Sequence, residues 1–396
     1  MTDSAKLMTP YFERDTGIKV TLDEMDEVRM YEKVMADHAA GIHNYDVIPM
    51  RDVDMLPYID KGIVRPLDDL INADYLPVPG LDIDDYPKAY FDGQCRRYGK
   101  LYGIIFGSGS TDLAVRKDWF ERDGVKIPTN FDEVAEAAKH FTDPKKKIYG
   151  ITFRGLKGHH ATCSWYMGGR LPWGGNVFEG TEAALKPAVN SDANVASLDF
   201  LTKLIPYAPP DIPSFTHEES TTAFATGHAA MYIDATQLIP WIENPKVSVA
   251  AGNTKHSLIP KAFPDLKYWT ALCGWTIGIG AFTKNVEAAM LFIEFMTAMR
   301  NAKVMVSLGA TAERFSVLKD ADMVNKYPYF PDFLEIISHA RYFHPLVVEC
   351  NEVNYAIGTE CGEAYLGTKT AKAALDGAQA KLSGMTVKGM PDPPAK

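Results

Sequence analysis

Cysteine is scarce in this sequence. Five cysteines are scattered over 396 residues, and no two of them form a C-x-x-C pair. This pattern excludes a disulfide framework and argues against zinc or redox motifs. Cys350 and Cys361 lie nearest in sequence, but on a continuous helix they are roughly 16 Å apart, beyond the ~7 Å limit for a bridge. Cys163 and Cys273 lie in apolar segments, where we expect buried thiols.

Long hydrophobic runs are also missing. The longest run, residues 271–282, is interrupted by Gly and Thr and falls short of the ~20 residues that span a bilayer. No signal peptide is recognised at the start of the chain. Residues 5–12 instead carry a helical pattern that we expect to end at Gly17.

Basic clusters are the third absence. Lys and Arg number 41 and Asp and Glu 51, which gives a net charge of −10. The one lysine run, residues 145–147, follows Pro144 and predicts a solvated turn. An acidic chain of this kind does not resemble a nucleic-acid-binding protein, and it suits a neutral ligand.

What is present is a large apolar fraction. Hydrophobic residues make up 46% of the chain, with 19 Tyr and 19 Phe. This composition is typical of a globular protein, and the length predicts two domains or two lobes of about 200 residues each.

Residues 98–142 carry the clearest succession of predicted elements in the chain. The apolar run 101–106 predicts a buried strand, followed by a loop of small residues at 107–111 and a further strand at 113–115. An apolar stripe over 131–141 predicts a helix, which Thr129 can cap. These elements describe a strand that leaves one sheet and a new α/β unit that begins.

Two further strands are predicted before this stretch. Residues 18–22 alternate in polarity, and residues 45–50 form an apolar strand that ends in Arg51 and Asp52. In open α/β sheets ligands bind beyond the carboxyl ends of strands. Arg51 and Asp52 are therefore candidate ligand contacts, with plain surface solvation as the open alternative.

The sequence contains no recognised catalytic motif. The segment Gly107-Ser108-Gly109-Ser110 lacks the third glycine and the helix register of a dinucleotide loop, and it is no nucleophile elbow. There is no Walker loop, H-E-x-x-H pair or EF-hand loop. A glycosidase carboxylate pair stays open, because no single sequence excludes one.

His159 and His160 invite a metal interpretation, which the spacing does not support. Neither has a His or carboxylate partner at i+3 or i+4, and adjacent residues point apart on a helix. We therefore expect no metal site. His159 and Trp165 are instead candidate sugar contacts, if this segment faces a cleft.

Four segments resemble the family 1 extracellular solute-binding proteins, the maltose-binding-protein-like sugar receptors of ABC importers. They are GKLYGIIFG…LAVRKDWFERDGVKIPTNFDEVAEAAK, FATGHAAMYIDAT, CGWTIGI and TAERFSVL. A generic α/β crossover is the alternative for the first segment. Cys273 and Ala312 stand where the family has Gly and Pro. The family also carries a signal sequence and a first strand that are expected to be missing here.

The resemblance implies an α/β, two-lobe periplasmic-binding-protein fold of type II, with a ligand cleft between lobes joined by a hinge. The chain is expected to cross between the lobes near residues 110–113, 269–274 and 311–316. The N-lobe would comprise residues 1–110 and 275–312, and the C-lobe residues 111–274 and 313–396.

The resemblance also implies ligand contacts. In the family, residues just past the Ala-Ala-Met strand commonly face the ligand. A Trp beside Gly at a strand end can lie open to a cleft, and the flat apolar face of Trp275 suits the C–H face of a pyranose. For Trp275 a core position is the alternative, and for Asp234 a helix N-cap. The set implied in addition to the candidates above is Ser108, Ser110, Thr111, Asp234, Thr236, Gly274, Trp275 and Arg341.

The function implied is capture of a carbohydrate or sugar alcohol by hinge closure and its delivery to the permease subunits of an ABC transporter. No cofactor, metal, nucleic acid or catalysis is expected, and the receptor would be a monomer in the periplasm or outside the cell. Two alternatives remain, a two-lobe α/β enzyme acting on a small carbohydrate and a non-functional truncated paralogue. Arg51, Arg154 and Arg341 leave an acidic sugar derivative possible.

Overall fold

The computed structural model describes residues 2–71, 73 and 81–392, and the chain divides into two compact units. The first unit comprises Met1–Gly109 and Gly274–Tyr327, the second Ser110–Cys273 and Pro328–Lys396. The chain therefore passes between the units after Gly109, Cys273 and Tyr327. The sequence placed the third passage within residues 311–316, whereas residues 313–327 belong to the first unit, where Arg314 donates hydrogen bonds to the carbonyls of Leu81 and Thr297.

The first unit surrounds a three-stranded sheet of order β1-β12-β4. Both pairings are antiparallel, with Arg51 opposite Trp275 and Thr276 opposite Ile105. The carboxyl ends of β1 and β4 and the start of β12 consequently share one edge. The elements of this unit are α1 (Thr2–Thr16), α2 (Glu27–Ala39), β1 (Val47–Arg51), α3 (Met55–Asp60), α4 (Asp68–Ile71), α5 (Lys88–Tyr90), β2 (Arg96–Arg97), β3 (Lys100–Leu101), β4 (Ile104–Ile105), β12 (Trp275–Ile279), α13 (Val286–Thr297), α14 (Met299–Ser307), α15 (Phe315–Leu318) and α16 (Ala321–Lys326).

Aromatic packing joins the first helix of this unit to a helix from its second segment. Phe12 on α1 is fully buried, and its ring lies 5.2 Å from Phe292 and 5.5 Å from Phe295 on α13, both edge-on. Buried aromatic pairs of this geometry add about 0.5–1.5 kcal/mol each beyond their area burial. The predicted N-terminal helix is confirmed and ends where Gly17 adopts a positive φ of 74°.

Two strand predictions in the first unit were wrong. Residues 18–22 form no strand, because none of them is buried and an alternating pattern needs one covered face. The apolar run 101–106 is divided between β3, which pairs with β2, and β4, which pairs with β12. Gly103 separates them, and a Cβ there would lie 3.0 Å from Cε of Met50.

The second unit is built on a four-stranded sheet of order β10-β5-β9-β6. Strand β5 is antiparallel to β9 and β10, while β6 is parallel to β9. The elements are β5 (Thr111–Arg116), α6 (Lys117–Asp123), α7 (Phe131–Phe141), β6 (Tyr149–Thr152), α8 (His159–Trp165), α9 (Leu171–Trp173), β7 (Phe178–Thr181), β8 (Ala184–Pro187), α10 (Asp192–Leu204), α11 (His217–Ala225), β9 (Ala229–Ala235), α12 (Ile239–Ile242), β10 (Thr254–Ser257), β11 (Thr270–Leu272), α17 (Phe330–Ser338), β13 (Ala340–Tyr342), α18 (Cys350–Tyr365) and α19 (Ala371–Ser383).

Local capping at α7 differs in one residue from the prediction. Asn130, not Thr129, is the N-cap, and its side chain accepts the backbone N–H of Glu133 at 2.9 Å. Thr129 instead bonds the Glu133 carboxylate through both its N–H (2.7 Å) and its hydroxyl (2.9 Å). The Asn130 cap and the bonds between Thr129 and Glu133 together stabilise the start of α7.

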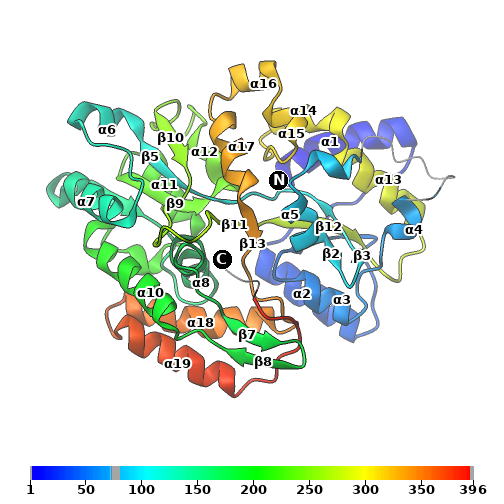
Figure 1. Ribbon diagram of the computed structural model, residues 1–396. Coiled ribbons are helices and arrows are strands. Elements are labelled where there is room, and N and C mark those ends of the chain that lie inside the picture. Colours follow the sequence, from blue (N-terminus) through cyan, green and yellow to red (C-terminus); the bar gives the residue numbers. More distant parts are fainter. Residues whose placement is uncertain (1, 72, 74–80, 393–396) are drawn as a thin grey trace. The chain divides into compact units, whose positions relative to one another are not determined.

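A helical layer closes the second unit. Helices α8, α10, α18 and α19 pack against one another, and Figure 1 shows α18 and α19 side by side in orange and red. All five cysteines of the chain are free and buried, which confirms the expectation for Cys163 and Cys273. Within the described ranges, no helix combines the length and the apolarity that crossing a membrane requires.

Close packing between α8 and α18 depends on Gly358. A Cβ at this position would lie 1.9 Å from the carbonyl oxygen of Gly158 and 2.2 Å from Oγ1 of Thr162. We expect Gly358→Ala to lower the free energy of unfolding by about 2 kcal/mol or more, because the helices must separate. Thermal and urea denaturation measure this. Gly384→Ala is the control, since its added Cβ meets nothing closer than 3.5 Å, and an equal loss in both variants would contradict the packing argument.

Candidate functional site

Asp52 and Trp275 meet at one edge of the first sheet. Asp52 follows β1, and its N–H donates to the carbonyl of Gly274 at 3.0 Å, while Gly274 N–H donates to Oδ2 of Asp52 at 3.2 Å. Gly274 has a φ of 132°, which favours glycine over any residue with a side chain. Trp275, the first residue of β12, is half-buried. A carboxyl group and an accessible indole therefore lie together at this edge.

Hydrogen bonds of the buried residue Ser108 hold the loop before Gly109 against the same edge of the sheet. Ser108 is fully buried, and its hydroxyl lies 2.8 Å from Oε1 of Gln94 and 3.1 Å from the carbonyl oxygen of Trp275. Its N–H donates to the carboxylate of Glu313, which also accepts the Thr311 hydroxyl at 3.0 Å. The predicted ligand contact Ser108 thus holds the loop in place. Glu313 was not foreseen, because nothing in the segment TAERFSVL distinguishes it from a solvated carboxylate.

Burial changes the acid strength of both carboxyl groups beside Trp275. Desolvation raises the pKa of Asp52 to about 7, although the Gly274 N–H and Arg51 oppose it. Desolvation likewise raises the pKa of Glu313 to about 7 against its bond from Ser108. Near neutral pH each carboxyl can therefore be a hydrogen-bond donor or an acceptor.

Arg51, a predicted contact, is engaged by the protein. Its Nε and Nη2 donate to the two carboxylate oxygens of Asp54, each at 2.7 Å, and both residues are buried. The guanidinium also lies 5.8 Å from the ring centroid of Tyr31. This bidentate pair fixes the turn after β1, on which Asp52 is presented.

A row of charged residues marks the corresponding edge of the second sheet. Asp112 on β5 lies opposite Asp234 on β9, and Arg154 follows β6, the parallel neighbour of β9. Asp112 and Asp234 are fully buried. Arg154 bonds both oxygens of Asp234 through Nε, at 2.9 and 2.8 Å. Asp234 lies inside β9, so the alternative of a helix N-cap does not apply.

His256 on β10 balances the other carboxylate. Its Nδ1 lies 2.6 Å from Oδ2 of Asp112, and its Nε2 lies 3.4 Å from Oε1 of Glu243 and 3.2 Å from Oγ1 of Thr254. Burial by itself disfavours the imidazolium, but the bonds to Asp112 and Glu243 outweigh it and raise the pKa of His256 to about 9. Burial also raises the pKa of Asp112.

Three predicted hydroxyl contacts secure the same edge. The hydroxyl of Ser110 donates to the carbonyl of Ala271 at 3.0 Å, and its N–H donates to Oγ1 of Thr236 at 2.9 Å. Thr111 Oγ1 accepts the N–H of Ala271 at 2.9 Å. All three hydroxyl side chains are fully buried and hold β5, β9 and β11 together.

The structure argues against Trp165 as a sugar contact. Its indole is fully buried within the second unit, and Nε1 donates to the hydroxyl of Ser197 at 2.8 Å. The residue lies at the end of α8, and its ring packs near Tyr166 and Gly169. His159, at the start of the same helix, is half-buried and lies 3.4 Å from Sγ of Cys163.

Arg341 lies on β13, a short strand that the sequence did not predict. The strand is parallel to β11, with Arg341 opposite Ala271. Cζ of Arg341 is 5.4 Å from the ring centroid of Trp269, a cation–π contact. Burial, with a smaller effect of the Arg170 charge, lowers the pKa of Arg341 to about 10.

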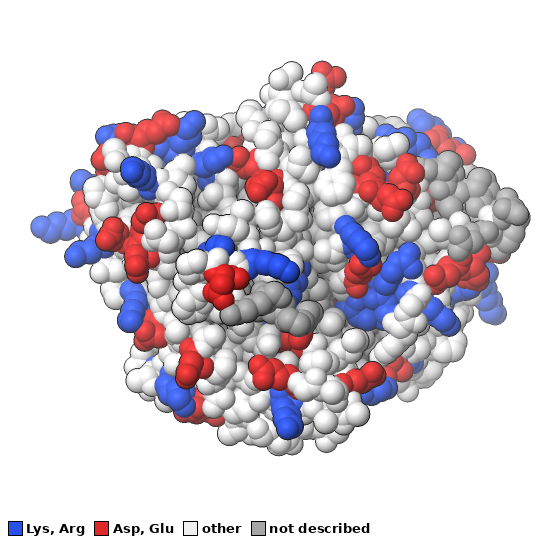
Figure 2. Space-filling model, viewed as in Figure 1, with Lys and Arg blue, Asp and Glu red and all other residues white. Residues whose placement is uncertain are grey.

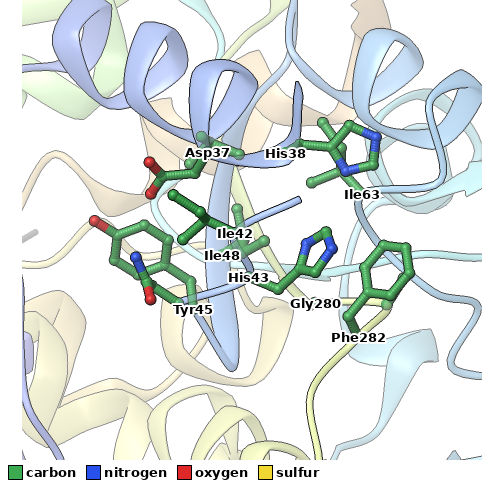
Figure 3. A pocket seen from close by; sticks show the side chains of 12 residues that line it. Asp37, His38, Ile42, His43, Tyr45, Ile48, Ile63, Gly280 and Phe282 are labelled. Atoms are coloured by element: carbon green, nitrogen blue, oxygen red, sulfur yellow. The ribbon is translucent and has the colours of Figure 1, made fainter. Parts of the chain in front are cut away.

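A separate hollow lies at the opposite edge of the first sheet. It is lined by the end of α2, the start of β1 and residues 280–282, which follow β12 (Figure 3). His43 stacks on Phe282 with ring centroids 3.8 Å apart, and Figure 3 shows His38 close to both rings. The lining combines apolar and aromatic side chains with the polar side chains of Asp37 and Asn44, and it shares no residue with the edge that carries Asp52 and Trp275.

Charge on the surface is dispersed. Figure 2 shows acidic and basic side chains interspersed over the face in view, separated by stretches of uncharged surface. Over the described part of the chain, no three or more His, Cys, Asp or Glu side chains gather as a metal-binding group.

A comparison with protein families settles the class. The model of the bacterial extracellular solute-binding proteins matches residues 1–303. The chain belongs to this family. The predicted resemblance and the two-lobe α/β fold of a periplasmic solute-binding protein are therefore confirmed.

Individual solute-binding proteins resemble the chain over nearly its whole length. A solute-binding protein of Agrobacterium radiobacter in complex with ribitol has a TM-score of 0.86 at 26% identity, covering 96% of this chain and 95% of that one. A solute-binding protein of Agrobacterium vitis with bound D-mannitol has a TM-score of 0.81 at 27% identity, with the same coverage. A probable amino-acid ABC transporter periplasmic-binding protein of Sinorhizobium fredii is 25% identical over 94% of this chain and 83% of its own length.

The buried His256 network predicts how the stability of this binding protein depends on pH. The folded pKa of about 9 lies above the ordinary 6.5, so its stabilisation is complete below pH 6.5 and is lost as the pH rises through 9. We expect His256→Gln to cost about 3 kcal/mol at pH 6, because Asp112 loses its partner. The difference from wild type should shrink toward pH 10 in urea unfolding.

The control is His140→Gln, which removes an exposed histidine paired with Asp123. Its effect should be small at every pH, because exposed ion pairs contribute little. A His256→Gln deficit that stays constant from pH 6 to pH 10 would contradict the assigned charge of His256.

Proposed function

We propose that this chain is the receptor of an ABC importer and that it binds a small sugar alcohol or a related neutral carbohydrate. The observation that carries the proposal is the family assignment together with the ribitol and D-mannitol complexes of its structural relatives. The sheet edges supply matching chemistry. They offer carboxyl groups poised between donor and acceptor, a guanidinium and a half-buried indole.

Each unit contributes one set of ligand contacts in this proposal. Asp52 and Trp275 belong to the first unit, and Arg154 and Arg341 belong to the second. A ligand that needs both sets stabilises the conformation in which both reach it, so binding favours closure about the three connections. The first unit would be the N-lobe and the second the C-lobe.

The location and the partners follow from the family. We assign the receptor to the periplasm or the outer face of the cell, as a monomer that delivers its ligand to membrane permease subunits. No catalytic step is assigned to it. The similarity to a probable amino-acid-binding protein supports amino acids as a second ligand class, which the first experiment includes.

A thermal-shift screen tests the ligand class. The panel contains ribitol, D-mannitol, erythritol, hexoses, sugar acids and amino acids. A ligand at one hundred times its Kd stabilises the folded state by about 2.7 kcal/mol, so a saturable rise in Tm with a polyol is expected. A rise only with amino acids, or conversion of a bound sugar into product, would overturn the proposal.

Trp275→Ala tests the stacking role of the indole. We expect the affinity for the bound polyol or sugar to fall by about 2 kcal/mol, roughly thirtyfold in Kd, because the apolar face of the ligand loses its partner. Isothermal titration calorimetry measures it. Trp119→Ala is the matched control, since Trp119 lies on α6, beyond the opposite end of β5 from Thr111. Unchanged affinity in a folded Trp275→Ala protein would refute the stacking role.

A further inference from the structure

The charged row of the second unit ends in a single cation that reaches solvent. Asp112, Asp234 and Arg154 lie side by side on β5, β9 and the end of β6, because Thr152 pairs with Tyr232 two residues earlier. The side chains of Asp112 and Asp234 are fully buried, whereas that of Arg154 is 12% exposed. Of these three residues, Arg154 is the one that a ligand can touch.

The guanidinium of Arg154 is divided between two tasks. Its Nε and Nη2 bond the carboxylate of Asp234, which also accepts the N–H of Ala235 at 2.7 Å. Within the described ranges, Nη1 of Arg154 makes no hydrogen bond to the protein. One side of the Arg154 guanidinium is thus fixed by Asp234, and the Nη1 side keeps its N–H groups for another partner. The guanidinium lies at the carboxyl ends of the parallel strands β6 and β9, and in open α/β sheets ligands bind at this end of the strands.

We propose that Arg154 contacts the ligand and determines its charge class, while Asp234 is a positioning residue that orients Arg154 and cancels its charge. This assignment rests on the proposed receptor function. It reverses the sequence-based expectation that Asp234 itself meets the ligand, because the carboxylate is buried and already bonded to Arg154 and Ala235.

The arrangement favours a neutral ligand over an anionic one. The Nη1 edge can donate to hydroxyl oxygens, and the charge of Arg154 is compensated by Asp234 directly behind it. Asp112 adds a further carboxylate one strand away, whose Oδ1 has no hydrogen-bond partner among the described residues. Asp112 is balanced by His256 and Asp234 by Arg154, so a carboxylated ligand would meet no uncompensated cation in this row.

Affinities for a polyol and for its aldonate test the assignment, measured by calorimetry on the wild-type protein and on variants. D-Mannitol and D-mannonate form one such pair and ribitol and D-ribonate another, and the pair whose polyol binds more tightly is used. Wild type should prefer the polyol. Arg154→Gln should weaken polyol binding at least tenfold. Asp234→Asn leaves the guanidinium uncompensated, so it should shift the affinity ratio at least tenfold toward the aldonate, a change that loss of packing alone does not produce.

Arg116→Gln is the matched control. Arg116 forms an equally bidentate pair with Asp118, at 2.9 and 2.6 Å, but at the opposite end of β5. Its removal should lower Tm and leave both the affinity and the polyol-to-aldonate ratio unchanged.

Two outcomes would overturn the roles assigned to Arg154 and Asp234 while leaving the proposed function intact. One is a folded Arg154→Gln protein with wild-type polyol affinity, and the other is an Asp234→Asn protein with an unchanged affinity ratio. If Arg154→Gln does not fold, the double variant with Asp234→Asn replaces it, since the two neutral amides can pair. A wild-type protein that binds no polyol or sugar overturns the proposed function, and the role of Arg154 with it.

Discussion

Two carboxylates buried opposite each other, Asp112 and Asp234, impose the main constraint on the second unit. Like charges on adjacent strands repel, and burial strengthens the repulsion, so each carboxylate needs its own cation. His256 supplies one from β10, and Arg154, two residues after the end of β6, supplies the other. These two ion pairs link the strands of the sheet in addition to the backbone hydrogen bonds. A shift in the register of one strand would separate its charged side chain from the oppositely charged partner on the neighbouring strand.

The carboxyl groups at the sheet edge of the first unit are bonded differently. The carboxylate of Asp52 accepts the backbone N–H of Gly274, and that of Glu313 accepts the backbone N–H of Ser108. Their pKa values rise to about 7 as a result of desolvation. One unit thus offers carboxyl groups that can change between donor and acceptor, and the other offers a fixed donor.

Several residues that look like ligand contacts in the sequence serve the scaffold. Ser110 and Thr111 bond the backbone of Ala271 on β11, Ser110 also bonds Thr236, and Arg51 is paired with Asp54. The sequence shows a hydroxyl or a guanidinium after a strand, but not which way the side chain turns. Glu313 and the pairing of Arg154 with Asp234 escaped sequence reasoning for the same reason, since 80 residues separate the second pair.

The sequence by itself determined the family, the α/β class and most of the helices and strands, because capping residues, glycine breaks and apolar periodicity are local signals. It also located the two edges where the strands end, through Asp52, Trp275 and Asp234. Tertiary structure alone decided that residues 18–22 pair with no strand, that Trp165 is core and that residues 313–327 belong to the first unit. Those outcomes depend on which distant segments cover a side chain or accept its hydrogen bonds, and no local pattern in the chain records them.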